Sequence, residues 1–168
     1  MTAGAKERVV SLAVLGACIG SLLVGTIGDA YGRRTAIIVG DVLMAVGCIL
    51  MYYSPTLLCL QIGRFVAGLG FGAEAFACNI YLAEVCPSSI RGAMIAANLA
   101  CCVSGQLIAL LVCIALAPDW RLMLGIAAVP AILQGLLMTF CMPETPYFLW
   151  RHDNQAEAME VLKNSFSD

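Results

Sequence analysis

Five long apolar segments dominate this sequence and limit the folds open to it. They lie at roughly 9–27, 36–53, 57–82, 92–116 and 120–142. Each is close to or above the ~20 residues that a helix needs to cross the hydrocarbon core of a bilayer. The segments are continuous rather than alternating, and lipid offers no hydrogen-bond partner to an open backbone. The sequence therefore predicts an all-α integral membrane protein with five transmembrane helices.

Composition supports the same class. Hydrophobic residues make up 61% of the 168 residues and charged residues only 12%. A soluble domain of this size could not bury so much apolar surface, because surface still dominates in small domains.

Proline and polar residues divide the chain into two parts. We predict a partial transmembrane bundle over residues 1–142 and the start of a cytoplasmic linker over residues 143–168, which opens with Pro143-Glu144-Thr145-Pro146. In the linker, Ala156, Met159 and Leu162 recur at three-residue spacing, which predicts a short amphipathic helix.

Basic residues indicate how the bundle is oriented. They lie between alternate segments and after the last one: Arg33, Arg34, Arg91, Arg151 and Lys163. Cytoplasmic loops carry the excess of lysine and arginine, so we expect the loops around Arg33 and Arg91 and the C-terminal tail to be cytoplasmic. Lys6 and Arg8 fall on the opposite side. That conflict, with the odd number of segments, indicates a helix missing before Met1.

Several function classes find no support in the sequence. The nine cysteines lie mostly singly in apolar segments, with no C-x-x-C motif and a single histidine, His152. This pattern indicates cysteines that pack as small hydrophobic residues. No nucleophile–base pair, phosphate-binding loop or basic stripe is present, so we expect no enzyme, no cofactor, no metal and no nucleic-acid partner.

Two glycine pairs have the spacing of close helix contacts. Gly16 and Gly20, and likewise Gly68 and Gly72, are four residues apart inside apolar segments. Such spacing lets two backbones approach closely. The alternative is that glycine is simply common in membrane helices, but the crowding of glycines around Gly70 favours close packing.

A short charged turn separates the first two segments. Asp29 ends one segment and Arg33 and Arg34 precede the next. An aspartate at the end of one helix can pair with an arginine across the turn. A solvated loop with the usual cytoplasmic arginines is the alternative, and both remain open.

Four polar side chains lie inside apolar segments. Arg64 and Glu74 belong to the third segment, Asn98 and Gln106 to the fourth. An ionised group at the bilayer centre costs at least ~2.5–3.5 kcal/mol on insertion scales. Because Arg64 and Glu74 are ten residues apart on one helix, we expect each to face another helix or water. Asn98 and Gln106 can form interhelical hydrogen bonds.

Asp41 stands near the start of the second segment. We expect it to lie close to the cytoplasmic end of its helix and to reach water.

An ordered set of motifs resembles the sugar porter family of the major facilitator superfamily. The motifs are Gly25-x-x-Gly28-Asp29-x-x-Gly32-Arg33-Arg34, Gly63-Arg64-x-x-x-Gly68-x-Gly70-x-Gly72, Tyr81-x-x-Glu84-x-x-Pro87-x-x-x-Arg91-Gly92, Gly105-Gln106, Trp120-Arg121 and Pro143-Glu144-Thr145-Pro146. The resemblance implies helices 2–6 of an N-terminal half, without the first helix and the second half. Residues 119–134 are similar to the sixth helix of the inositol and hexose subgroup.

The resemblance implies transport of a sugar or polyol, with proton coupling in some members, and assigns roles to residues. Gln106 matches a position that hydrogen-bonds sugar hydroxyls, and an amide can both donate and accept. Arg64 matches an arginine that neighbours a proton-carrying aspartate of the first helix in proton-coupled members. The residues that match the cytoplasmic gate network are Asp29, Arg33, Arg34, Glu84, Arg91 and Glu144.

Departures from the family keep alternatives open. Tyr147 replaces an arginine of the gate, Asn79 a proline, and Glu74 a small residue. Acidic residues near the Glu74 position occur in proton-coupled phosphate and organic-anion symporters, and residues 91–97 resemble theirs. A second reading is therefore such a symporter with Glu74 as proton carrier.

A third reading is a truncated, non-transporting partner of a full-length transporter. Alternating access needs two halves around a central site. We therefore expect this chain alone not to transport. Its expected partners are the bilayer, a small-molecule substrate, protons if transport is coupled, and the remainder of the transporter.

Overall fold

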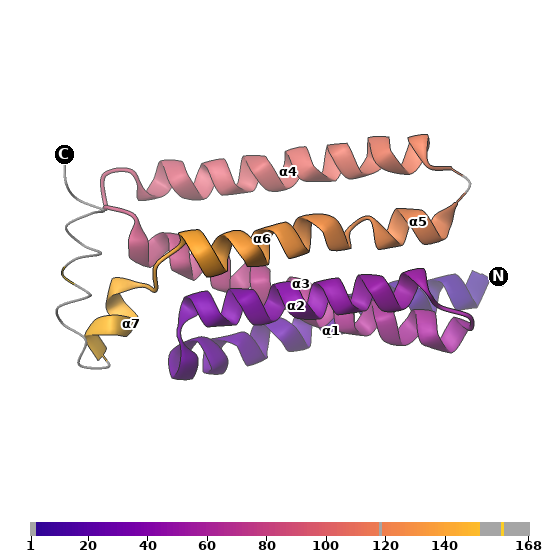
Figure 1. Ribbon diagram of the computed structural model, residues 1–168, viewed down its shortest axis with the longest axis horizontal. Coiled ribbons are helices and arrows are strands. Elements are labelled where there is room, and N and C mark those ends of the chain that lie inside the picture. Colours follow the sequence, from indigo (N-terminus) through magenta and orange to yellow (C-terminus); the bar gives the residue numbers. More distant parts are fainter. Residues whose placement is uncertain (1–2, 118, 152–158, 160–168) are drawn as a thin grey trace.

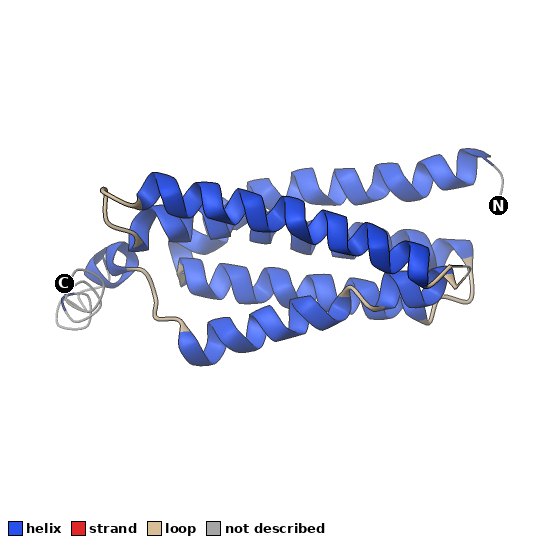
Figure 2. Ribbon diagram, turned by 90° about the horizontal axis from the view of Figure 1, so that it is seen from above, coloured by secondary structure: helices blue, strands red, loops and turns tan. Residues whose placement is uncertain are grey.

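The computed structural model describes residues 3–117, 119–151 and 159, and all regular structure in these ranges is helical (Figures 1 and 2). The helices are α1 (Ala3–Tyr31), α2 (Arg33–Tyr52), α3 (Leu57–Val85), α4 (Arg91–Ala115), α5 (Trp120–Gly125), α6 (Ala128–Cys141) and α7 (Pro146–Arg151). Five candidate spans result, with α5 and α6 together forming the fifth. The predicted all-α class and number of spans are confirmed. The predicted helix around residues 156–162 lies outside the described residues, apart from Met159.

The helices run back and forth along the long axis of the molecule (Figure 1). The α1–α2, α3–α4 and α6–α7 connections meet at one end, which we call the charged end. The N-terminus and the α2–α3 and α4–α5 connections meet at the other. The basic loops of the sequence thus share one end, as their alternation predicted.

The α1–α2 turn is tighter than predicted. Residues 28–35 were expected to lie between the two apolar segments as a short charged turn, but Gly32 alone separates the two helices. Gly32 has φ 97°, a conformation that glycine adopts without steric cost. Its amide donates to the Gly28 carbonyl at 3.1 Å, and its own carbonyl accepts from the Ala36 amide at 3.1 Å. The charged residues on both sides of Gly32 are helical, and Asp29, Arg33 and Arg34 form ion pairs or hydrogen bonds there.

The fifth span is broken rather than continuous. Pro130 has no amide to donate to the Ile126 carbonyl, so the regular i→i−4 bond is missing. The Val129 amide donates to that carbonyl instead, at 3.1 Å. The helix therefore divides at Ile126–Ala127 into α5 and α6.

Helix α3 packs so closely against α1 that the two backbones are in contact. A Cβ at Gly16 or Gly20 would overlap the backbone of Phe65 or Leu69, and one at Gly68 would overlap that of Ala13. The predicted glycine contact is confirmed.

The sequence reading missed an equivalent contact between α2 and α3. A Cβ at Gly47 would lie 2.5 Å from the Ala67 nitrogen, and one at Gly70 would lie 2.5 Å from the Gly40 oxygen. Helix α3 is thus held between two neighbours by small residues.

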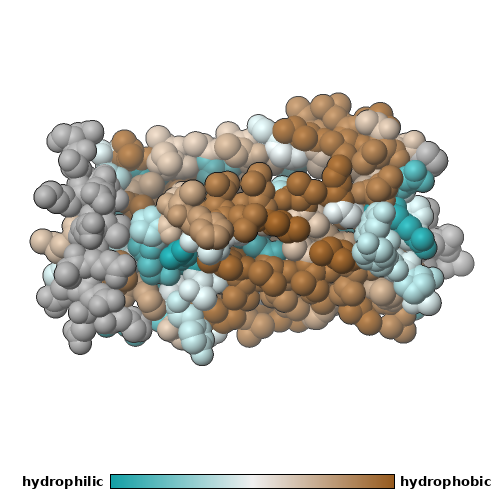
Figure 3. Space-filling model, viewed as in Figure 1, coloured by the Kyte–Doolittle hydropathy of each residue, from teal (hydrophilic) through white to brown (hydrophobic). Residues whose placement is uncertain are grey.

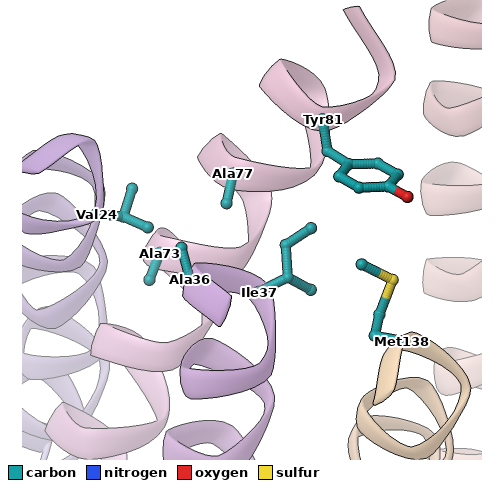
Figure 4. Packing of buried hydrophobic residues seen from close by; sticks show 7 residues of the cluster. All are labelled: Val24, Ala36, Ile37, Ala73, Ala77, Tyr81 and Met138. Carbon is teal, nitrogen blue, oxygen red and sulfur yellow. The ribbon is translucent and has the colours of Figure 1, made fainter. Parts of the chain in front are cut away.

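A buried apolar cluster ties α1, α2, α3 and α6 together near the charged end (Figure 4). It consists of Val24, Ala36, Ile37, Ala73, Ala77, Tyr81 and Met138. Met138 of α6 points toward Ile37 and Tyr81 (Figure 4). The Tyr81 hydroxyl donates to the Pro143 carbonyl at 2.9 Å, which fixes the start of the linker on α3.

Helix α4 stands apart from this bundle (Figure 1). None of its residues is buried, and its leucines and isoleucines are largely exposed. Apolar side chains also cover much of the face shown in Figure 3. Such a surface requires lipid or further protein against it.

Replacing a contact glycine tests this packing. We expect Gly20→Ala to lower the free energy of unfolding by about 1–3 kcal/mol, because α1 and α3 must separate to admit the methyl group. Gly105→Ala is the matched control, since nothing lies within 4 Å of a Cβ there. It should leave stability unchanged or raise it by up to about 1 kcal/mol. Denaturant titration in mixed micelles measures both, and equal effects would contradict the close contact.

Candidate functional site

The polar side chains form two separate groups. One lies at the charged end and joins α1, α2, α3, α6 and α7. The other lies inside the bundle between α2, α3 and α6. Both consist of residues from distant parts of the sequence.

Arg33 is the centre of the group at the charged end. Its Nη1 lies 2.7 Å from Asp29 Oδ1, and its Nε lies 3.2 Å from Glu84 Oε1. Nη1 also donates to the Gly28 carbonyl at 2.6 Å. The Arg33 side chain is only 11% exposed. Of the two alternatives for this turn, the paired clasp is the one observed, and Glu84 extends it to α3.

Tyr147 adds an aromatic contact to the same arginine. The Arg33 guanidinium carbon lies 5.9 Å from the centre of the Tyr147 ring. This distance is within the range of a cation–π interaction. The residue that replaces the family's arginine therefore still contacts the group, by attraction to a cation instead of by an ion pair.

Arg34 and Glu144 connect the N-terminus of α2 with the C-terminus of α6. The Arg34 side chain donates to the carbonyls of Met138, at 2.9 Å, and Thr139, which satisfies acceptors at a helix end. Glu144 Oε1 accepts from the Arg34 amide at 3.0 Å and the Thr145 amide at 3.1 Å. A carboxylate at the N-terminus of α2 is also favoured by the helix dipole.

Glu144 gives Gly32 a second constraint. A Cβ at Gly32 would lie 2.5 Å from Glu144 Oε2. Both the positive φ and the carboxylate therefore exclude a side chain at this turn.

Five of the six residues predicted for the gate network belong to these contacts. Arg91 does not: it begins α4 and is exposed, and its side chain has no hydrogen bond or ion pair with the residues that the structure describes. Its role in a gate stays a prediction.

The second group contains Glu74, Gln134 and Asp41, which we call the carboxylate cluster. Gln134 Nε2 of α6 donates to Glu74 Oε1 of α3 at 2.8 Å. The expectation that Glu74 faces another helix is confirmed.

The expectation that Asp41 reaches water was wrong. Asp41 is 2% exposed, and both of its carboxylate oxygens lack a hydrogen-bond partner among the described residues. Because α2 begins at Arg33, Asp41 lies eight residues, roughly 12 Å, from the helix start. Helix α6 covers it there: a Cβ at Gly135 would lie 3.4 Å from Asp41 Cβ.

Asn98 and Asn79 link α4 to α3. Asn98 Nδ2 donates to Asn79 Oδ1 at 3.4 Å, and Asn79 Nδ2 donates to the Ala75 carbonyl at 2.8 Å. The interhelical bond predicted for Asn98 is confirmed.

The structure does not test the roles predicted for Gln106 and Arg64. Gln106 is exposed on α4, and its side chain has no hydrogen bond with other described residues. Arg64 is partly exposed on α3, and its Nε is buried without a partner in the part of the chain that the structure describes.

The cysteines and acidic side chains are the residues that could form disulfide bonds or bind a metal ion. All nine cysteines are free. Within the described ranges, no three histidine, cysteine or acidic side chains form a group that could hold a metal ion.

Sequence reasoning missed Gln134 and Tyr147 as members of these groups and misplaced Asp41. Gln134 carried a usable signal, because an amide inside an apolar segment needs a partner. Tyr147 was noted only as a replacement of the family's arginine, because its contact with Arg33 depends on where α7 lies relative to α2.

Removing the central arginine should weaken the charged end. We expect Arg33→Gln to lower the free energy of unfolding by about 1–3 kcal/mol, because hydrogen bonds to charged groups contribute about 1.5–3 kcal/mol each and Glu84 would lose its partner. Arg91→Gln, at an exposed arginine, should change it by less than about 0.5 kcal/mol. Unfolding followed by tryptophan fluorescence measures both variants. Equal losses would mean that the Arg33 contacts contribute nothing to stability.

Comparison with known proteins places this architecture. Residues 3–167 match the family model described as "Sugar (and other) transporter". The chain is 38% identical over 165 residues to "Probable inositol transporter 2" and 37% identical over 164 residues to "Inositol transporter 4", both from Arabidopsis thaliana. Each alignment covers 96% of this chain and 28% of the relative. The chain thus spans less than a third of the length of these relatives.

A solved structure shows the same fold. The chain is similar to the proton:xylose symporter XylE from E. coli, bound to 6-bromo-6-deoxy-D-glucose, with a TM-score of 0.88 and 24% sequence identity. The match covers 99% of this chain and 42% of XylE.

Proposed function

Because the chain belongs to the sugar (and other) transporter family, we propose that it forms part of the N-terminal half of a multi-pass membrane transporter for a sugar or polyol of hexose or inositol type. The observation that carries the proposal is the similarity to inositol transporters over 96% of the chain. The family is one of transporters, so we propose no catalytic reaction. In this assignment residues 1–142 contribute to the transmembrane bundle and residues 143–168 begin the linker to the second half.

The polar side chains of the bundle suit an uncharged polyol. Amides on three helices lie inside the apolar segments: Asn79 on α3, Asn98 and Gln106 on α4, and Gln134 on α6. An amide can donate to one hydroxyl and accept from another. The Gln106 side chain is exposed on α4 and makes no hydrogen bond with other described residues. It is therefore our candidate for binding substrate hydroxyls.

In an alternating-access transporter, the charged end would help to close the cytoplasmic side. The basic loops meet there, so we propose that this end faces the cytoplasm. Arg33 holds α1, α2 and α3 together, while Asp29 (59% exposed) and Arg91 remain accessible to a second half. Their pairing with that half would close the cytoplasmic side and would break when the halves rock apart.

A chimaeric transporter tests the substrate. Residues 3–151 would replace the matching segment of Inositol transporter 4, and uptake of inositol, hexoses and phosphate would be measured at matched surface expression. We expect uptake of inositol or a hexose and none of phosphate. Gln106→Ala should raise KM roughly tenfold, since a lost hydrogen bond of about 1.5 kcal/mol corresponds to that factor.

Ser104→Ala is the control for Gln106→Ala. Ser104 is also exposed on α4, and its hydroxyl donates to the Ala100 carbonyl of its own helix at 2.8 Å. We expect the KM of the Ser104→Ala variant to be unchanged.

The chain alone, reconstituted in liposomes, should show no uptake. Uptake of phosphate without inositol or hexose would overturn the sugar assignment.

The position of Glu74 supports a second candidate function, a proton-coupled symporter of phosphate or an organic anion. Its carboxylate is half-buried and accepts a hydrogen bond from Gln134 between α3 and α6, where a proton carrier could act. If this candidate is right, Glu74→Gln in the chimaera should abolish uptake driven by a pH gradient. If the sugar assignment is right, it should change uptake little. Uptake at several external pH values distinguishes them.

A third candidate, a non-transporting partner of a longer transporter, is favoured if this chain co-purifies with a full-length relative. The exposed α4 is the surface through which such binding would occur.

A further inference from the structure

Asp41 is an acidic side chain with no local compensation. It is 2% exposed, and both oxygens lack a hydrogen-bond partner among the described residues. Glycines surround it on two sides: Gly40 precedes it on α2, and Gly135 of α6 faces it, where a Cβ would lie 3.5 Å from Asp41 Oδ2. Small residues therefore bring two helix backbones against a buried carboxylate.

Glu74 lies at the same level of the bundle. A Cβ at Gly40, the residue before Asp41, would lie 3.2 Å from Glu74 Cβ. Glu74 is tied to α6 through Gln134 at 2.8 Å. Two acidic side chains and one amide thus meet where α2, α3 and α6 pack. The cluster lies roughly 12–15 Å from the charged end, measured along α2 and α3 at ~1.5 Å per residue.

No cation in the described chain compensates these two charges. Arg64 lies ten residues before Glu74, roughly 15 Å away along α3. Arg33, Arg34 and Glu84 belong to the charged end.

The neighbouring elements supply few other titratable groups. Described α6 residues include no charged side chain, and the acidic and basic residues of α1 lie near its ends. Cys78 lies one helical turn after Glu74 on α3 and is a half-buried free thiol, and Cys102 of α4 is an exposed free thiol.

Two ionised carboxylates in this position would be costly. Burying one ionised group without a partner costs several kcal/mol, and a second like charge beside it adds repulsion. A single bound proton removes one charge. A protonated carboxyl group also carries an O–H that can donate a hydrogen bond, which a carboxylate cannot do.

We propose that Asp41 and Glu74 form a buried proton-binding site between α2, α3 and α6, in which the pair holds one proton and Gln134 orients Glu74. The site is separate from Arg64 and from the charged end. Its occupancy depends on the packing of these three helices and not on which substrate the transporter carries.

Infrared spectroscopy of the chain in lipid nanodiscs tests the proposal. A protonated carboxyl group gives a carbonyl band that shifts in heavy water, distinct from the bands of carboxylates and amides. We expect this band at neutral pH in the unmodified chain. The double variant Asp41→Asn with Glu74→Gln should lose it, and each single variant should shift it or abolish it. Asp119→Asn, at an exposed aspartate, should leave it unchanged.

Several results would overturn the proposal. These are the absence of the band in the unmodified chain, its persistence in the double variant, and single variants that leave it unaltered. A band that disappears when sodium replaces potassium at constant pH would identify a metal-cation site instead. If circular dichroism shows that the double variant is unfolded, the two single variants decide the question. The measurement needs no substrate, so its failure is distinct from failure of the proposed transport.

Discussion

The arrangement depends on backbone contact between α3 and its two neighbours. Glycines at Gly16, Gly20 and Gly68 bring α1 against α3, and Gly47 and Gly70 bring α2 against it. In lipid, burial of apolar surface gives little drive for helices to associate, so close van der Waals contact must supply it. Once α3 is held between α1 and α2, the positions of two acidic side chains along it follow from geometry alone. Glu84 reaches Arg33 at the charged end, and Glu74 reaches α6 in the interior.

The two polar groups differ in how their charged side chains are compensated. At the charged end, carboxylates, guanidinium groups and helix ends satisfy most of one another's bonding capacity, although Glu84 Oε2 and Thr145 Oγ1 are buried without a partner among the described residues. Inside the bundle, the carboxylate cluster has one amide for two carboxyl groups and no cation. A polar group in a low-dielectric interior must be paired or neutral. The first group is therefore suited to hold helices and loops together, and the second to bind something small.

Particular residues show how far the sequence could be read. The five spans followed from continuous apolar length, and the glycine contact of α1 with α3 followed from spacing, because both are properties of consecutive residues. The Asp29–Arg33 pair was one of two open alternatives, since a turn's compactness depends on a single dihedral angle at Gly32. Asp41 was misplaced because its burial is caused by α6, which begins 87 residues later in the chain (128 − 41). Pro130 was visible in the sequence, yet the division of the fifth span had to be observed.

The sequence by itself determined the membrane class, the number of spans and the resemblance to sugar porters, because hydrophobic length and ordered motifs are local properties of the chain. Only the tertiary structure decided which polar groups meet. It brought Glu84 and Tyr147 to Arg33, placed Gln134 beside Glu74, and left Asp41 without a partner. The physical reason is that such partners are set by how helices cross and by the small residues that let them approach, which no single segment specifies.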